Sequence, residues 1–388
     1  MDLLSEVTQS KACVIIQIGR RHLKAGFSRR LEPFVILQTS ELFSKCEETV
    51  EIKKNENENE REYVTLFKES KYWRRDLSIL IRKLYMEHLR CNSKDYPVLL
   101  LERALFPSEL SSCICNILYE TFEVPAIKRI SEPITSLFTT GILSGIIVDI
   151  GTNETIITPI YNGYPIEYNI KVIQCGYLSL RDNFKKMLLE QCKLNEPDKV
   201  KQIENISDKM LDNLIFRSAI VREYFESEKC SIEINDLAFE NIFLNDEYIN
   251  IFVSKETRHK PFNIFFGEKQ NESNVVHNIV LDGIIDCIKF SNMEIRKEIS
   301  QNIIICGGVG SVPGFEQRIQ NELKEYASND KNLSKISDHI FVSSPPISPF
   351  LRSYTGAVIM LLTDKRPNFT FIENSKSTIF NIGSKNSL

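Results

Sequence analysis

The chain has 388 residues, 42% of them hydrophobic and 26% charged, with a formal net charge of -4. That length predicts two domains, and the composition is that of an ordinary soluble globular protein. The small negative charge gives no reason to expect nucleic acid as a ligand, and no apolar run approaches the ~18 residues needed for direct membrane insertion.

The first predicted element is a β-hairpin. An apolar strand, Val14 to Ile16, runs into Gly19, and a second strand follows around Lys24 to Phe27. Backbone amides at the tip of such a turn can cradle a phosphate group. However, Arg20 and Arg21 occupy this tip, and no acidic residue stands where a phosphate-bound metal ion would need one.

A polar segment and then alternating helices and strands follow. The run EIKKNENENERE, 51–62, predicts a solvated loop or a disordered insert, with a charged docking loop as the alternative. Helical spacing at 76–89 precedes a buried strand at 96–102, and a further helix is expected with Ser108 as its N-cap. The apolar stripe of that helix is expected in the core. It comprises Leu110, Cys113, Ile114, Ile117, Leu118 and Phe122.

A second hairpin, at 145–166, repeats the pattern of the first. Val14 to Gly19 and Ile146 to Gly151 share an apolar run, a polar residue, an isoleucine and a glycine. One supersecondary unit used twice at domain-length spacing predicts two similar halves that face a common cleft.

The remaining elements predict an α/β protein. The run NIIICGGVGSVPGFEQRI, 302–319, indicates a buried strand, a glycine turn and a helix, an order that suits close approach to a phosphate or sugar but also fits a simple turn. Strand-like sequence is expected at 229–266. Helices are expected at 131–140, 177–192, 207–227, 275–290, 314–327 and 357–362.

Cysteine and histidine spacing predicts neither a disulfide framework nor a transition-metal site. Ten cysteines are scattered, and the close pair Cys113 and Cys115 has neither zinc-knuckle nor redox spacing. The five histidines are equally dispersed. The start, MDLLSEVTQSK, lacks the pattern of a secretory signal. We therefore expect a cytoplasmic protein with free, mostly buried thiols.

Several long motifs resemble actin, in the same order along the chain. They are KAGF (24–27), YPVLLLERALFP (96–107), YETFEVPAI (119–127), VDIGTNETIITPIYNGYP (148–165) and IRKEISQNIIICGGVGSVPG (295–314). The resemblance covers nearly the whole chain apart from roughly 38–75 and 228–270.

This resemblance implies the actin-like ATPase fold, an α/β fold with two related domains around a central nucleotide cleft. It implies a small domain of 1–140 with 345–388 and a large domain of 141–344. Residues 38–75 match the subdomain-two region, which is expected to be reduced and partly disordered.

The resemblance also implies a degenerate nucleotide site for a structural ATP or ADP. Its candidate residues are Gly19, Lys24, Asp149, Gly151, Gly307 and Gly308. Each has a structural alternative, since glycine fits tight turns, Asp149 can cap a turn and Lys24 can be a plain surface charge.

Family positions that support hydrolysis are changed. Gln17 replaces the aspartate that reaches the metal ion, and it lacks the negative charge that a hard divalent cation prefers. Arg20 and Arg21 replace the Ser-Gly that touches phosphate. Glu132 stands for the glutamine that orients the attacking water, and Ile156 for the histidine near it.

The second and third loops depart as well. Thr152 and Asn153 replace an Asp-Gly pair, and Val312 replaces the tyrosine that flanks adenine. Phe225-Glu226 replaces the lysine-glutamate pair that holds the adenosine. We expect no catalytic residue, no metal ligand and no meaningful ATPase activity.

Among actin relatives, the chain is similar to the actin-related subunits at the pointed end of dynactin. The similarity lies in FPSELSSCICNILYETFEVPAI (106–127), in the 295–315 run, and in the SPP and TGA segments near the C-terminus. It implies a non-catalytic subunit that caps the pointed end of the actin-related filament, contacts the other pointed-end subunits, and is linked indirectly to dynein and cargo adaptors. A reduced subdomain-two loop fits a cap, because that loop grips the next protomer in actin filaments. The expected location is cytoplasmic and cytoskeletal, including the microtubule-organising centre.

Two other functions are alternatives. A nuclear actin-related subunit of a chromatin-remodelling complex also lacks hydrolysis, but such subunits often carry long insertions that this chain lacks. An active actin-fold ATPase or kinase needs an acidic residue on the first hairpin, and Gln17 argues against it.

Overall fold

The computed structural model describes residues 12–53, 61–68, 71, 73–221, 237–244, 247–266, 279–363 and 372–373. The chain divides into two compact units, unit 1 (residues 1–132 and 357–388) and unit 2 (residues 133–356). The sequence placed the domain changes at 140/141 and 344/345. Each unit has its own sheet and helices, so the predicted α/β class is confirmed.

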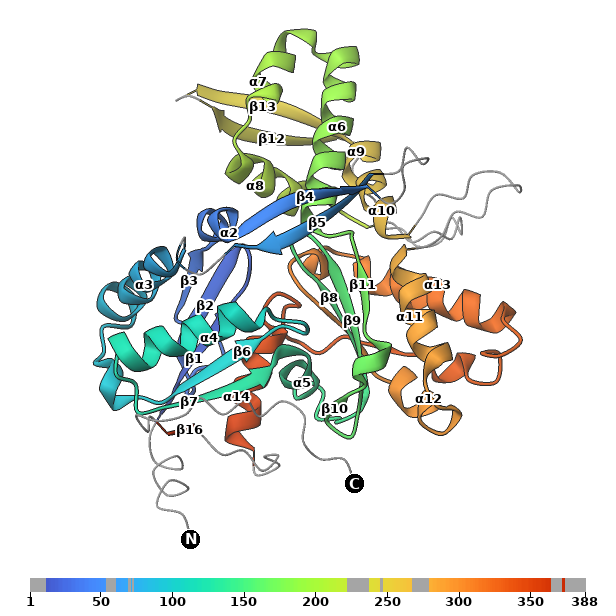
Figure 1. The fold of residues 1–388 in the computed structure, drawn as a ribbon. Helices are drawn as coiled ribbons and strands as arrows, with labels where there is room; N and C mark the ends of the chain where they lie inside the picture. Colours follow the sequence, from blue (N-terminus) through green and yellow to red (C-terminus); the bar gives the residue numbers. More distant parts are fainter. Residues whose placement is uncertain are drawn as a thin grey trace. The chain divides into compact units, whose positions relative to one another are not determined.

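Unit 1 contains a six-stranded mixed sheet. Its strands are β1 (Val14–Ile18), β2 (His22–Phe27), β3 (Val35–Gln38), β6 (Val98–Glu102), β7 (Ala126–Ser131) and β16 (Ile372–Glu373). They lie in the order β16-β7-β6-β1-β2-β3 (Figure 1). β1, β6 and β7 run parallel, while β2, β3 and β16 pair antiparallel. The first predicted hairpin and the strand predicted at 96–102 are confirmed.

Two helical segments of unit 1, at 74–89 and 108–121, follow the predicted apolar periodicity. The helices of unit 1 are α2 (Ser40–Cys46), α3 (Arg74–Lys83) and α4 (Ser108–Asn116), with the π-helical turns η2 (Leu84–Leu89) and η4 (Ile117–Thr121) and the 3-10 turn η3 (Ser93–Asp95). A further helix, α5 (Glu132–Leu137), starts at Glu132 of unit 1 and continues in unit 2. All six stripe residues of α4 and η4 are buried, as predicted. The predicted N-cap at Ser108 is wrong, because Pro107 holds the extended cap position (φ -60°, ψ 125°) and Ser108 is already helical.

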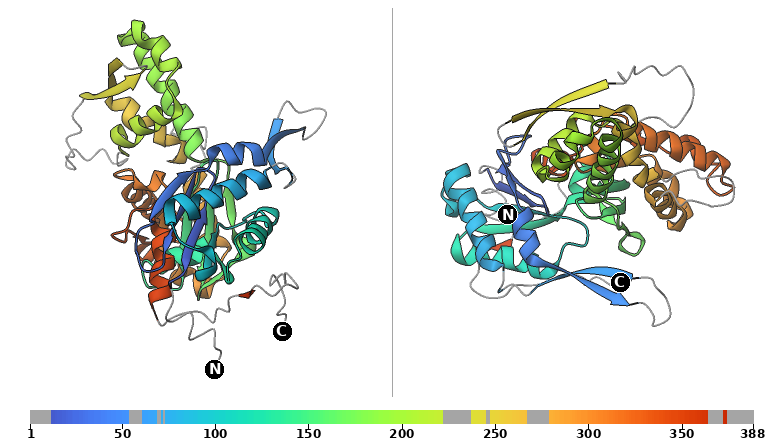
Figure 2. Two further views of the ribbon diagram at one scale, coloured as in Figure 1. Left: turned by 90° about the vertical axis from the view of Figure 1, so that its left-hand side faces the viewer. Right: turned by 90° about the horizontal axis from the view of Figure 1, so that it is seen from above.

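A two-stranded antiparallel hairpin projects from the sheet of unit 1 (Figure 2). Its strands are β4 (Glu47–Lys53) and β5 (Arg61–Phe67). The solvated loop predicted at 51–62 is therefore wrong at both ends of the run. β-branched residues such as Val50, Ile52 and Val64 favour a strand despite the polar residues around them. Residues 54–60 lie outside the described residues.

Unit 2 repeats the strand arrangement of unit 1. Its main sheet consists of β8 (Gly145–Ile150), β9 (Thr155–Tyr161), β10 (Tyr164–Pro165), β11 (Lys171–Ile173), β14 (Ile303–Cys306) and β15 (Val342–Ser343). The order is β10-β9-β8-β14-β15, with β11 also paired to β9. In both sheets, an antiparallel hairpin is extended by two parallel strands beside its first strand. The predicted repeat of one unit is confirmed.

Helices surround this sheet and a second hairpin of strands β12 (Leu237–Leu244) and β13 (Glu247–Ser254). They are α6 (Tyr177–Asn195), α7 (Val200–Glu204), α8 (Asp208–Ser218), α9 (Lys255–His259), α10 (Asn263–Phe266), α11 (Ile279–Phe290), α12 (Met293–Ser300), α13 (Phe315–Asn329) and α14 (Arg352–Leu362), which continues into unit 1. The 3-10 turns are η5 (Glu167–Asn169), η6 (Pro197–Lys199), η7 (Lys260–Phe262), η8 (Val309–Ser311) and η9 (Ser337–His339).

Two predicted elements of unit 2 end early. The helix predicted at 207–227 stops at Ser218, because the extended Ile220 and Val221 donate their amides to the carbonyls of Arg258 and Pro313. The strand-like prediction for 229–266 is wrong after Ser254. Ser254 is the N-cap of α9, because its hydroxyl accepts a hydrogen bond from the Thr257 amide at 3.3 Å. Residues 222–236 and 267–278 lie outside the described residues.

Each unit has its own hydrophobic core. In unit 1, Val14, Ile16 and Ile18 of β1 enter the core, since alternate residues of a strand face one side. In unit 2, β14 is buried on both faces, as expected of a central parallel strand: Ile303 and Ile305 pack in a different cluster from Ile304 and Cys306. Among the described residues, no helix is long and apolar enough to cross a membrane.

Candidate functional site

Gly19 closes the tip of the β1–β2 hairpin. Its amide donates to the His22 carbonyl at 2.9 Å, and its carbonyl accepts from the Thr39 hydroxyl at 2.6 Å. The Thr39 amide also donates to the Arg21 carbonyl at 3.0 Å. A Cβ on Gly19 would lie only 3.1 Å from the His22 oxygen. The turn itself therefore favours glycine, and both backbone polar groups of Gly19 are used within the protein.

Behind this tip, Lys24, Gln17 and Glu132 form a buried polar chain. Lys24 Nζ donates to Gln17 Oε1 at 3.4 Å, and Gln17 Nε2 donates to Glu132 Oε2 at 2.6 Å. Strand register places Gln17 opposite Lys24, and Glu132 is the first residue of α5. The three residues are only 6–7% exposed, so Lys24 is not a plain surface charge.

The charge at this tip comes from arginine and lysine rather than from histidine. Burial, aided by the neighbouring cations Arg21 and Lys24, lowers the pKa of His22 to about 4. His22 is therefore neutral at pH 7.

The β8–β9 hairpin of unit 2 has the same closure. The Gly151 amide donates to the Glu154 carbonyl at 2.9 Å. The carbonyls of Gly151 and Thr152 accept the first two amides of α6, from Tyr177 and Leu178, at 3.0 and 2.9 Å. Within the described part of the chain, the amides of Thr152 and Asn153 have no acceptor. This tip can therefore offer two amides to an anionic group.

The third loop, after β14, lies at the same end of the unit 2 sheet. Asp149 pairs with Cys306 in the register, so Asp149 and Gly307 come close together. Gly307 has φ +96°, and a Cβ there would lie 2.1 Å from the Ile150 carbonyl oxygen. Its amide donates to the Pro349 carbonyl at 3.1 Å. Gly307 is thus required for the close approach of two backbones.

Aromatic side chains of the protein itself face Gly308. A Cβ on Gly308 would lie 3.7 Å from the ring of Phe216 and 3.9 Å from that of Phe350. Phe216 stacks on Tyr177, with ring centroids 5.5 Å apart and planes at 8°. Sequence reasoning missed both phenylalanines, since they come from α8 and from the loop before α14.

The candidate residues therefore fall into two sets. Gly19 and Lys24 belong to unit 1, and Asp149, Gly151, Gly307 and Gly308 belong to unit 2.

Comparison with known proteins matches residues 8–344 to the family described as Actin. The chain belongs to the actin family. It is 26% identical over 279 residues to "Putative actin-29" of Dictyostelium discoideum. The aligned region covers 68% of this chain and 66% of that protein. It is 22% identical over 366 residues to "Actin-related protein 10" of the same organism. That aligned region covers 83% of this chain and 75% of the relative. The chain thus spans slightly less than two thirds of the first of these relatives.

The actin-like fold is therefore the fold of this chain, but the first hairpin does not fit a metal-bound triphosphate. At position 17 the family's aspartate is replaced by Gln17, and at position 132 the family's glutamine is replaced by Glu132. The Gln17 amide nitrogen, a donor that cannot ligate a cation, is directed at the Glu132 carboxylate. Among the described residues, no group of three or more His, Cys, Asp or Glu is placed to hold a metal ion.

Two other positions at which this actin-family chain departs from actin are buried. Ile156 is 4% exposed and Val312 is 5% exposed, and Val312 packs in the core of unit 2. Phe225 and Glu226 lie outside the described residues.

Cys175 and Cys306, which lie beside these loops in this actin-family chain, are buried. The described cysteines are free, and six of the eight are buried, as predicted. Burial raises the pKa of Cys175 to about 11, so its thiol stays protonated at neutral pH.

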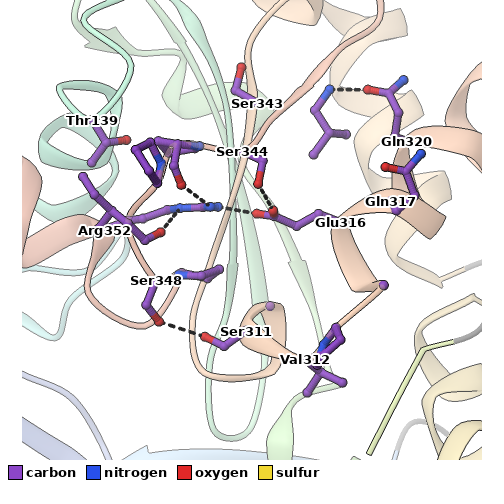
Figure 3. A pocket seen from close by; sticks show the side chains of 18 of the residues that line it. Thr139, Ser311, Val312, Glu316, Gln317, Gln320, Ser343, Ser344, Ser348 and Arg352 are labelled. Atoms are coloured by element: carbon purple, nitrogen blue, oxygen red, sulfur yellow. Dashed lines mark hydrogen bonds and ion pairs between the residues drawn. The ribbon is translucent and has the colours of Figure 1, made fainter. Parts of the chain in front are cut away.

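A cavity of about 1030 Å³ in unit 2 is built around a buried arginine (Figure 3). Arg352 is 1% exposed and donates to the carbonyls of Ile305 and Ile347 at 2.6 and 3.1 Å. Its guanidinium also pairs with Glu316, which accepts from the Ser344 hydroxyl at 2.5 Å. Arg352 therefore fastens the proline-rich loop to β14 and α13. Sequence reasoning missed this residue, because its carbonyl partners have no side-chain signature.

Proposed function

We propose that this actin-family chain is a non-catalytic structural subunit that caps the pointed end of the actin-related filament of dynactin. The observation that carries the non-catalytic part is the buried Lys24–Gln17–Glu132 chain. The similarity to "Actin-related protein 10" and the sequence resemblance to dynactin pointed-end subunits support the assembly part.

Phosphoryl transfer on this fold depends on metal charge and an oriented water molecule. Gln17 supplies no charge to a cation and presents a donor to Glu132 instead. Ile156, buried in place of the family histidine, cannot act on a water molecule. We therefore propose that any ATP or ADP held by the chain is a structural ligand, with the open amides of Thr152 and Asn153 on its phosphates.

An exposed apolar surface of unit 2 supports assembly with other proteins. We call Tyr164, Tyr168, Phe290 and Met293 the apolar patch; Tyr164 is 78% and Met293 is 82% exposed. The turn η5 and the end of α11 are adjacent, because the Asn169 side chain donates to the Cys287 carbonyl at 2.8 Å. Exposed aromatic and methionine side chains on neighbouring segments are typical of protein interfaces.

The proposed partners follow from this role. They are the actin-related filament subunits and the other pointed-end subunits of dynactin, with dynein and cargo adaptors bound indirectly. The proposed location is the cytoplasmic cytoskeleton.

The experiment is a mild affinity purification of the tagged full-length chain from its own cells, with co-purifying proteins identified by mass spectrometry. We expect dynactin filament and pointed-end subunits in fixed ratio. The double variant Tyr168→Ser/Met293→Ser should lose the filament subunits, whereas Leu194→Ser, an equally exposed change on α6, should keep them. Recovery of a remodelling ATPase, or of the monomer alone, would overturn the proposal.

A further inference from the structure

A basic groove of about 500 Å³ follows the exposed face of α3 in unit 1. Its lining includes no carboxylate among the described residues. The cationic residues that line it are Lys71, Arg74, Arg75 and Arg82. The whole chain has a formal net charge of -4, so this local concentration of positive charge has the opposite sign.

Helical spacing arranges the groove. Arg75, Ile79 and Arg82 are separated by four and three residues, which places them along one face of α3. Leu77 and Ile81 occupy the buried face. Ile79 is 54% exposed, whereas Ile117 of η4, which also borders the groove, is only 1% exposed. One exposed apolar side chain, Ile79, therefore lies between the guanidinium groups on this face.

Two of the arginine side chains have no partner among the described residues. The side chains of Arg75 and Arg82 form no hydrogen bond or ion pair with any residue that the structure describes. Arg74 pairs with Glu120 at 2.9 Å, but both side chains are about half exposed or more, so that pair is weak. The groove thus presents guanidinium groups that a ligand can engage in bidentate contacts.

We propose that this groove binds an acidic peptide segment of a partner protein, with an apolar side chain between its carboxylates. The carboxylates pair with Arg75 and Arg82, and the apolar side chain packs on the exposed Ile79. A phosphate group or an anionic lipid headgroup would use the arginines but not Ile79. The groove lies in unit 1, and this inference does not depend on the proposed function.

The test measures binding of a fluorescein-labelled synthetic peptide to the purified full-length chain by fluorescence anisotropy. In the peptide, leucine recurs every fourth position among glutamates. We expect Arg82→Glu to weaken binding by about tenfold or more, because it reverses one charge of a close pair. Lys83→Glu is the matched control: it makes the same change on the next residue, which does not line the groove, and should alter affinity less than about twofold.

Further probes separate the apolar contact from simple charge attraction. Ile79→Ser should weaken binding of the glutamate–leucine peptide and leave that of polyglutamate unchanged. Equal losses for Arg82→Glu and Lys83→Glu would overturn the proposal, as would polyglutamate binding as tightly as the leucine peptide. Arg82-dependent binding of inositol hexakisphosphate or phosphatidylserine vesicles without binding of the peptide would overturn it too. Thermal melts of each variant confirm that these exposed changes leave the fold intact.

Discussion

The β1–β2 hairpin of unit 1 and the β8–β9 hairpin of unit 2 close their tips in the same way. The Gly19 amide donates to the His22 carbonyl in the first, and the Gly151 amide donates to the Glu154 carbonyl in the second, both at 2.9 Å. In each case, the segment at the start of the following helix donates to carbonyls of the tip: Thr39 in unit 1 and Tyr177 in unit 2. The backbone of the two tips is therefore nearly the same.

Their side chains differ. The first tip carries two arginines and has its strand glutamine bound to Glu132, whereas the second keeps Asp149 and two amides without acceptors in the described structure. Because backbone contacts alone close each turn, the hairpin persists when the residues for metal chemistry change. A retained phosphate-loop shape is thus weak evidence of retained chemistry, and three predictions test this view.

The largest effect is expected at Gly307, in the loop beside the second tip. Gly307→Ala should lower the free energy of unfolding by about 3 kcal/mol or more, because its Cβ would collide with the Ile150 carbonyl at a positive φ. Gly308→Ala, the adjacent control, meets only ordinary contacts and should change it by less than about 1 kcal/mol. Urea unfolding of the full chain measures both. Equal effects would contradict a backbone requirement at Gly307.

The second effect concerns the polar chain of the first tip. Glu132→Gln should destabilise the fold by about 3 kcal/mol, since it removes a buried carboxylate from the chain that includes the Lys24 ammonium. Adding Gln17→Asp restores a carboxylate beside Lys24 and should recover most of that loss. Chemical denaturation of both single variants and the double variant gives their coupling energy. Simple additivity would show that the three residues do not act together.

The third effect is a pH dependence at the same tip. The pKa of His22 is lowered from 6.5 to about 4, so between these values the unfolded chain binds a proton that the folded chain does not. This contribution to stability is complete above pH 6.5 and is lost as the pH falls toward 4. Over that window, the unfolding free energy of wild type should fall more steeply than that of His22→Gln, by up to about 1.4 kcal/mol per pH unit. Parallel curves would contradict a partly buried, neutral His22.

The sequence was sufficient to predict the repeated hairpins, the buried stripe of α4 and the strand–turn–helix order around Gly307, because these depend on local periodicity and turn residues. The sequence predicted a loop over parts of β4 and β5, and it predicted strand-like sequence where α9 lies. The contact between Gln17 and Glu132 was not predictable, since the two residues lie 115 positions apart in the sequence and meet only in the folded chain. The aromatic rings at Gly308 and the role of Arg352 likewise depend on tertiary packing.

The most direct test of the central claim is release of inorganic phosphate from Mg-ATP by the purified full-length chain, measured beside Lys24→Ala. Loss of the aspartate at position 17 and the carboxylate-bound amide of Gln17 predict the same background rate for both proteins. Turnover by the wild-type chain well above that of Lys24→Ala would contradict the account and restore an enzymatic role to the first hairpin.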